Sequence, residues 1–225
     1  MGRIQLKDVQ KTFGNVEVIP PLNLEIEDGE FVVFVGPSGC GKSTTGKLLL
    51  RLIEPDQGII NFDGQTVTGM PKRQLTALRR EMQIIFQDPY SSLNPRMRVG
   101  EIIGEGLALH SKQSNADIRD NVADWLNRVG LQADHMSRYP HEFSGGQRQR
   151  IMIAMALANK PDLLIADEPT TALDVTIQAQ ILELLAQIQK SEGMGMLFIT
   201  HDLSVVRRIA DRVCVMKDGQ IVEVG

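Results

Sequence analysis

Residues 36–44 read GPSGCGKST, and this stretch decides the fold. The apolar run at 31–35 before it is typical of a buried strand, and the leucine-rich residues 47–53 after it favour a helix. The glycines therefore lie on a turn from a strand into a helix, where backbone N–H groups can surround a phosphate. Lys42 can reach the β- and γ-phosphates of a nucleotide, and the Ser43 hydroxyl suits Mg²⁺. The stretch predicts a phosphate-binding loop.

Composition sets the broad class. A chain of 225 residues can bury a good core, and 42% hydrophobic with 23% charged residues is ordinary for a globular protein. A net charge of −4 argues against a bulk nucleic-acid binder. No apolar run reaches membrane-spanning length, and the N-terminal residues do not form a signal peptide. Two isolated cysteines, Cys40 and Cys214, give no disulfide framework and no metal-binding spacing, which fits a reducing cytoplasm.

Polar side chains follow three further apolar runs that read as buried strands, at residues 82–86, 163–166 and 196–199. In open α/β sheets, ligands bind beyond the carboxyl ends of the strands, so we expect these polar side chains at one edge. They are Gln87, the pair Asp167 and Glu168, and His201. Asp167 can hold Mg²⁺ through its water shell, and Glu168 stands where a general base belongs. Gln87 suits a metal or a water, or simply caps a loop; His201 suits a γ-phosphate contact, or is structural.

The N-terminal residues predict a separate antiparallel sheet. Residues 4–9 and 22–26 alternate between apolar and polar side chains, and we expect the pair at 20–21, two prolines, to break the chain between them. Phe13 is expected in a loop, where it either stacks on a nucleobase or folds onto the core. Near the other end of the chain, residues 213–216 and 220–224 predict a hairpin.

Strand patterns vanish between residues 88 and 159, and apolar residues recur at helical spacing up to Gly130. We therefore divide one domain, residues 1–225, into an α/β core with its β subdomain (1–87 and 160–225) and a helical subdomain (88–159). Further helices are expected near 177–188 and at 203–210. Ser144 is expected to cap a helix whose first turn, Gly145 and Gly146, lets an anion approach. This second anion site lacks a lysine, so it is either a partial site or a well-capped helix.

These residues together resemble the nucleotide-binding subunits of ATP-binding-cassette (ABC) transporters over essentially the whole chain. Six family motifs occur in the right order: Walker A (GPSGCGKST), the Q-loop (Gln87), the signature motif (FSGGQ, 143–147), Walker B (LLIADE, 163–168), the D-loop (TALD, 171–174) and the switch histidine (His201). Phe13 falls where the family has an aromatic residue that stacks on adenine.

The resemblance implies a P-loop NTPase fold of the α/β class, with a mainly parallel core sheet, an N-terminal antiparallel β subdomain and a helical insert. It implies hydrolysis of ATP with Mg²⁺, catalysed by Glu168, His201 and Gln87, with Ser43, Gln87 and Asp167 at the metal. The nucleotide contacts would be Phe13, Gly36, Pro37, Ser38, Gly39, Cys40, Gly41, Lys42, Ser43, Thr44, Ser144, Gly145, Gly146, Gln147 and Asp174.

The implied partners are a second nucleotide-binding subunit and transmembrane permease subunits, with no nucleic acid. Two subunits would pair head to tail, so that Ser144, Gly145 and Gly146 of one cover the nucleotide of the other. The helical insert would contact the permease near residues 90–93. The chain would then lie in the cytoplasm, peripheral on the inner face of the cell membrane.

Three longer stretches, at residues 86–101, 138–150 and 166–182, resemble dipeptide and oligopeptide importers, whereas the first 44 residues resemble sugar importers. The sequence is therefore interpreted as a mosaic of the two branches that powers a peptide importer. The main alternative is a soluble ABC ATPase that acts on nucleic acid or ribosomes, although such relatives usually carry a coiled-coil insert or two cassettes. A P-loop kinase would leave FSGGQ and His201 unexplained, and an inactive mosaic is a third alternative.

Overall fold

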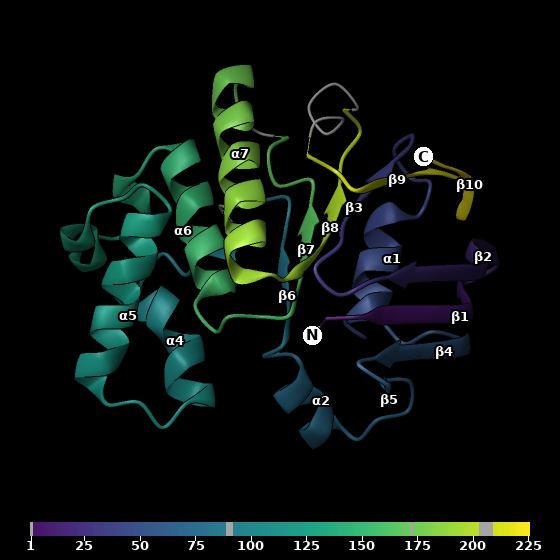
Figure 1. Cartoon of the computed structure of the whole chain (residues 1–225), viewed down its shortest axis with the longest axis horizontal. Coiled ribbons are helices and arrows are strands. Elements are labelled where there is room, and N and C mark those ends of the chain that lie inside the picture. The colour runs from purple at the N-terminus through teal and green to yellow at the C-terminus, as the bar shows by residue number, and fades with distance from the viewer. Residues whose placement is uncertain (1, 89–91, 172, 203–208) are drawn as a thin grey trace.

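The computed structural model describes residues 2–88, 92–171, 173–202 and 209–225. Its larger sheet has the strand order β10-β9-β3-β8-β7-β6, and every neighbouring pair is parallel except β9 with β10. This confirms the mainly parallel core sheet and the C-terminal hairpin (Figure 1). The strands are β3 (Phe31–Val35), β6 (Met82–Ile85), β7 (Leu163–Asp167), β8 (Gly195–Ile199), β9 (Arg212–Lys217) and β10 (Gln220–Val224).

The central strands of this sheet are buried on both faces, as their unbroken apolar runs predict. In β3, Phe31, Val33 and Val35 pack into a core shared with the helices on one side of the sheet. Val32 and Phe34 of the same strand pack into a second core on the opposite side. Because successive side chains of a strand point to opposite faces, one apolar strand serves both cores.

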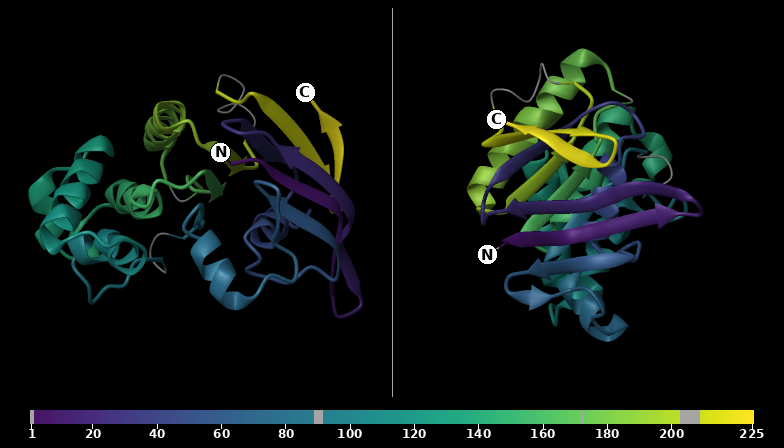
Figure 2. Two further views of the ribbon diagram at one scale, coloured as in Figure 1. Left: turned by 60° about the horizontal axis from the view of Figure 1, so that its bottom comes forward. Right: turned by 90° about the vertical axis from the view of Figure 1, so that its right-hand side faces the viewer.

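The smaller sheet is antiparallel and has the order β2-β1-β4-β5, which confirms the N-terminal β subdomain. Its strands are β1 (Ile4–Phe13), β2 (Val16–Ile26), β4 (Gln57–Phe62) and β5 (Gln65–Thr66). It packs around α1 (Lys42–Leu49) beside the hairpin of β9 and β10, as the side view shows (Figure 2).

The predicted break at the two prolines is wrong, because β2 continues through Pro20 and Pro21. Ile19 pairs with Lys11 of β1, and Leu22 pairs with Val9, so the two prolines face one residue of the partner strand. This is a bulge on an edge strand, where a missing N–H donor leaves no ladder bond unmade.

Phe13 is also not in a loop: it is the last residue of β1 and pairs with Val16 across the hairpin. Its side chain is 48% exposed, so it does not fold onto the core. The Lys11 ammonium lies 5.4 Å from the centre of the ring. The exposure that stacking on a base requires is present, and the stacking itself stays a prediction.

Helices α5, α6 and α7 lie where the apolar spacing and the cap at Ser144 predict them, whereas the spacing does not single out α4. Within the described part of 88–159, the regular elements are all helical: α4 (Val99–His110), α5 (Asn115–Arg128), α6 (Gly145–Leu157) and the short turns η1 (Ala133–Ser137) and η2 (Pro140–Glu142). The division into subdomains stays a prediction. Outside that segment lie α2 (Lys72–Leu78) and α7 (Val175–Glu192). Most of the helix predicted at 203–210 falls outside the described residues. No described helix combines the length and the apolar character that crossing a bilayer needs.

Candidate active site

The loop between β3 and α1 has the backbone that a phosphate-binding loop needs. Gly39 and Gly41 adopt φ angles of 80° and 101°, which side chains other than glycine rarely tolerate. A Cβ on Gly41 would come within 2.6 Å of the Ile19 side chain, whereas Gly39 has open space beside it. The loop is therefore packed firmly at Gly41 and open to a ligand at Gly39.

A cavity of about 270 Å³ opens against this loop. The loop and the first turn of α1 form one wall, and residues at the ends of β6 and β7 form the other. Its lining residues are Ser38, Gly39, Gly41, Lys42, Ser43, Thr44, Gln87 and Glu168. Since the N-terminus of α1 points its N–H groups into the same space, the cavity fits a phosphate group.

Lys42 is held inside the loop rather than extended into solvent. It is only 4% exposed, and its ammonium donates hydrogen bonds to the carbonyl oxygens of Gly36 (2.7 Å) and Pro37 (2.9 Å). The Cys40 sulfur lies 3.7 Å from the same nitrogen. Among the described residues no carboxylate forms an ion pair with Lys42, so its positive charge remains available to an anion in the cavity.

Ser43 and Asp167 meet below the loop, as the metal prediction requires. The Ser43 hydroxyl donates to Oδ1 of Asp167 at 2.7 Å, and Asp167, the last residue of β7, is 6% exposed. Burial raises the pKa of the Asp167 carboxyl above its ordinary value, and the bond from Ser43 opposes that rise. The described residues contain no group of three His, Cys, Asp or Glu side chains able to hold a metal ion. This pair fits Mg²⁺, which commonly takes few protein ligands and completes its shell with water and phosphate oxygens.

The polar residues that follow β6, β7 and β8 come together at the side chain of Glu168. It follows β7 with a left-handed φ of 47°, and its N–H donates to the Ile199 carbonyl at 2.9 Å. Its Oε2 accepts a hydrogen bond from Nε2 of Gln87 at 3.3 Å and lies 3.4 Å from Nδ1 of His201. The structure thus brings Gln87, Glu168 and His201 together, as expected from their common position after parallel strands.

Thr171 belongs to this cluster and was missed by the sequence reasoning. Its hydroxyl donates to Oε2 of Glu168 at 2.9 Å. The only signal in the sequence is the turn-forming Glu-Pro-Thr-Thr run, which places a hydroxyl three residues after the carboxylate.

The signature residues lie elsewhere in the chain and form a helix cap. The Ser144 hydroxyl accepts from the N–H of Gln147 at 3.3 Å, and Oε1 of Gln147 accepts from the N–H of Ser144 at 3.0 Å. This capping box confirms the predicted start of α6. Asp174 caps α7 with a single bond and no capping box: its Oδ1 accepts from the N–H of Ile177 at 3.0 Å.

Several predicted nucleotide contacts do not line the cavity beside Lys42. They are Phe13, Gly36, Pro37, Cys40, Ser144, Gly145, Gly146, Gln147 and Asp174. A contact of these residues with nucleotide stays a prediction. For the signature residues and Asp174, the contact would have to come from a second copy of the chain.

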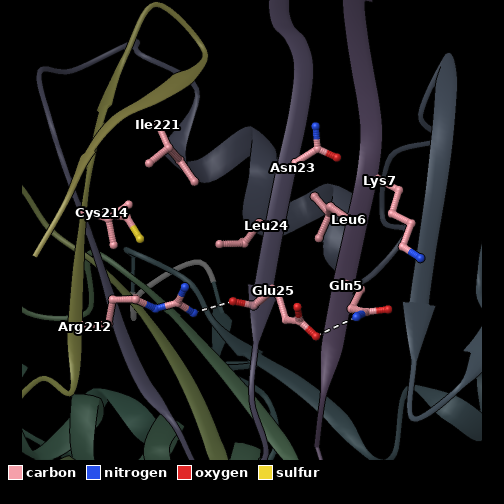
Figure 3. A pocket seen from close by; sticks show the side chains of 10 residues that line it. Gln5, Leu6, Lys7, Asn23, Leu24, Glu25, Arg212, Cys214 and Ile221 are labelled. Atoms are coloured by element: carbon pink, nitrogen blue, oxygen red, sulfur yellow. Dashed lines mark hydrogen bonds between the residues drawn. The ribbon is translucent and has the colours of Figure 1, made fainter.

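A larger cavity, of about 490 Å³, lies between the strands β1 and β2 and the hairpin of β9 and β10 (Figure 3). Arg212 there is already paired, because it donates to both Glu30 oxygens and to the Glu25 carbonyl. Glu25 in turn accepts from Gln5 at 2.5 Å and from Arg3. The two cavities share no lining residue. The larger volume therefore does not mark the functional site. The phosphate-binding loop, Lys42 and Glu168 all line the smaller cavity, which favours it as the site.

The model of the ABC transporter family matches residues 19–171, and the chain belongs to this family. It is 49% identical, over 98% of its length, to the oligopeptide transport ATP-binding protein OppF of Bacillus subtilis (strain 168), of which it covers 74%. It is 51% identical, over 93% of its length, to the glutathione import ATP-binding protein GsiA of Pectobacterium atrosepticum; it spans about a third (34%) of that relative.

Solved structures agree with this assignment. The chain superposes with a TM-score of 0.90 on a dimeric post-hydrolysis state of the ATP-binding cassette MJ0796 bound to ADP and Pi. The two are 31% identical, and the match covers 99% of this chain and 97% of the other. The protein is therefore an ATP-binding-cassette ATPase, as the motifs predicted. The relatives named here are transport proteins, so the alternative of an ATPase for nucleic acid or ribosomes is not favoured.

Proposed function

We propose that this ATPase powers a peptide importer whose solute is an oligopeptide or a small peptide such as glutathione. The observation that carries this proposal is the identity of about half to the OppF and GsiA proteins over nearly the whole chain. The alignment with OppF covers 98% of the chain, so it includes most of the N-terminal stretch that resembles sugar importers.

The proposed chemistry uses the cluster around the cavity. The N–H groups of residues 36–41 and the Lys42 ammonium hold the phosphates, and Glu168 accepts the proton of the attacking water. His201, whose Nδ1 lies 3.4 Å from Oε2 of Glu168, would contact the γ-phosphate. Ser43, Gln87 and Asp167 would hold Mg²⁺, which when bound neutralises charge on the phosphate oxygens. The Phe13 ring would stack on adenine.

The proposed active unit is a head-to-tail dimer. The capped N-terminus of α6, with Ser144, Gly145 and Gly146, does not line the cavity of its own chain. The N-terminus of α6 can attract an anion, but the signature motif there contains no lysine. A second copy of the chain would supply that lysine together with its phosphate loop, and the two parts would form one nucleotide site. In that arrangement Asp174, the N-cap of α7, would also lie at the interface between the two copies.

Mixing two inactive variants tests this sharing of sites. Lys42→Ala removes the phosphate contact of its own chain, and Ser144→Arg blocks the signature of its own chain, so one site of a mixed dimer carries both lesions and the other neither. Mixing should restore part of the turnover, or trap ATP at one site per dimer if both sites must act together. Phosphate release and filter-bound ATP are the measurements.

Neither variant alone should recover on self-mixing, which is the control. If mixed dimers form but show neither recovered turnover nor ATP trapped at one site, the signature residues act only as the helix cap of α6.

The permease partner is proposed to dock on the helical segment. A groove of about 400 Å³ there is lined by Arg98, Gly100, Glu101, Asn115, Ile118, Arg119, Val122, Met136 and Ser137. Its apolar floor and charged rim fit a short amphipathic helix of a membrane protein. Within the predicted contact at 90–93, residues 90 and 91 lie outside the described residues, and Leu93 is buried at 3% exposure. Such docking places the chain in the cytoplasm, on the inner face of the membrane.

Peptide uptake in vesicles tests the transport proposal. Vesicles that contain an oligopeptide permease and this chain should accumulate a labelled tripeptide or glutathione in an ATP-dependent way, and should leave maltose outside. The exposed Arg119 on the rim of the groove gives a matched variant: Arg119→Glu should lower uptake several-fold while ATP binding persists. Uptake of maltose but of neither peptide would instead assign the chain to sugar import.

A further inference from the structure

We propose that Thr171 is a positioning residue that fixes Glu168, so that one carboxylate oxygen is held and the other receives the proton. The inference rests on the proposed role of Glu168 as the base. Within the described part of the chain, every hydrogen bond and ion pair of the Glu168 carboxylate involves Oε2. The other oxygen, Oε1, has no hydrogen bond or ion pair among the described residues, so it is the one available to a water. The side chain of Glu168 is 15% exposed, so few orientations are open to it.

The contact from Thr171 is the closest of the three. Its hydroxyl lies 2.9 Å from Oε2, whereas Nε2 of Gln87 lies at 3.3 Å and Nδ1 of His201 at 3.4 Å. A hydroxyl bonded to an ionised carboxylate is a charge-assisted donor, and such bonds are stronger than neutral ones. Thr171 is therefore the nearest hydrogen-bond donor to the Glu168 carboxylate among the described residues.

The backbone delivers the Thr171 hydroxyl to this place. The N–H of Thr171 donates to the Glu168 carbonyl at 3.4 Å, which closes a turn across Pro169. Pro169 fixes one dihedral of that turn, and Glu168 itself adopts a left-handed φ of 47°. The donor and its acceptor are thus the two ends of one short, restrained turn.

Helix α7 also holds this turn, residues 168–171, in place. The side-chain amide of Gln178 donates to the carbonyl of Thr170 at 2.9 Å and to the carbonyl of Leu173 at 3.1 Å. The first of these carbonyls belongs to the residue next to Thr171. A rigid helix therefore supports the loop that carries the hydroxyl, which is the arrangement that keeps a positioning group in place.

Thr171 also differs in its proposed role from Gln87 and His201, the other two residues that contact the Glu168 carboxylate. Gln87 is proposed at the metal and His201 at the γ-phosphate, so both are expected to engage the nucleotide during the cycle. The one side-chain hydrogen bond of Thr171 in the described structure is the bond to Glu168. Its hydroxyl can keep the base oriented while its neighbours move to the nucleotide.

Thr171→Val removes the hydroxyl and keeps the shape, so it separates positioning from packing. We expect the kcat for ATP hydrolysis to fall about tenfold, the effect of losing one hydrogen bond to a charged group. The KM, and the ATP affinity measured by calorimetry, should stay within about twofold of the parent. Thr171→Ser, which keeps the hydroxyl, should restore most of the rate, and Thr171→Ala should repeat the loss.

A double-variant cycle shows whether Thr171 acts through Glu168. If it does, Thr171→Val should cause no further loss of turnover in a chain that already carries Glu168→Gln. An unchanged kcat in both Thr171→Val and Thr171→Ala overturns the proposal, as does an equal fall of kcat and ATP affinity. If Glu168→Gln itself kept full turnover, Glu168 would not be the base. That result would contradict the proposed function, and the single variant Glu168→Gln is enough to detect it.

Discussion

Replacing Glu168 with glutamine should lower ATP turnover by about 10²-fold or more and leave ATP binding intact. The amide keeps the size of the carboxylate and still accepts hydrogen bonds, but it cannot take a proton from water. Thr171 can still donate to the amide oxygen, so the turn after β7 should keep its shape. Steady-state phosphate release measures the turnover, and calorimetry measures the binding.

The same variant should accumulate the ATP-bound dimer, because ATP closes the dimer and is no longer removed by hydrolysis. Size-exclusion chromatography with Mg-ATP would show the shift. Glu183→Gln is a matched control, since Glu183 is an exposed glutamate on α7 away from the cavity, and it should behave like the parent. Full turnover in Glu168→Gln would mean that another group is the base.

Replacing Lys42 with alanine should weaken ATP affinity at least tenfold. Lys42 is 4% exposed, and its ammonium bonds only neutral acceptors among the described residues, so its charge is not cancelled before a phosphate arrives. A charge-assisted bond to phosphate is stronger than a neutral one, and the buried setting reduces the competition from water. Calorimetric titration with Mg-ATP gives the affinity directly.

The control for this variant is Lys72→Ala, which removes an equal charge from an exposed position at the start of α2. Its ATP affinity should match that of the parent. Thermal unfolding should show that Lys42→Ala remains folded, because the lost side chain bonds only to its own loop. If ATP affinity were unchanged in a folded Lys42→Ala chain, the assignment of residues 36–44 as the phosphate loop would be wrong.

The core of the fold could be predicted because its signals are local and strong. Strands such as β3 and β8 are apolar at every position, which happens when both faces are covered. The gathering of Gln87, Glu168 and His201 could be predicted for a geometric reason: residues that follow parallel strands reach the same edge of a sheet.

Other features depend on neighbours that a sequence pattern does not reveal. The strand through Pro20 and Pro21 survives only because β2 is an edge strand, and edge position is a property of the whole sheet. Thr171 carries no periodic signal, and its contact with Glu168 depends on the left-handed turn after β7. The two chemical roles considered for Ser144 look alike in one chain, since a helix cap and an anion site use the same residue types.

The proline pair in β2 also bears on how this ATPase meets other copies of itself. An open sheet edge offers a row of N–H and C=O groups on which a foreign strand can grow, and this leads to aggregation. Neither Pro20 nor Pro21 has an N–H group to offer to a foreign strand, and the two prolines form a bulge in the strand. The turn between β9 and β10 also covers this part of the edge, because Gly219 packs closely against Pro20. The smaller sheet is thereby discouraged from extending into a neighbouring molecule. The proposed dimer would instead form through the surfaces that carry the phosphate loop and the N-terminus of α6.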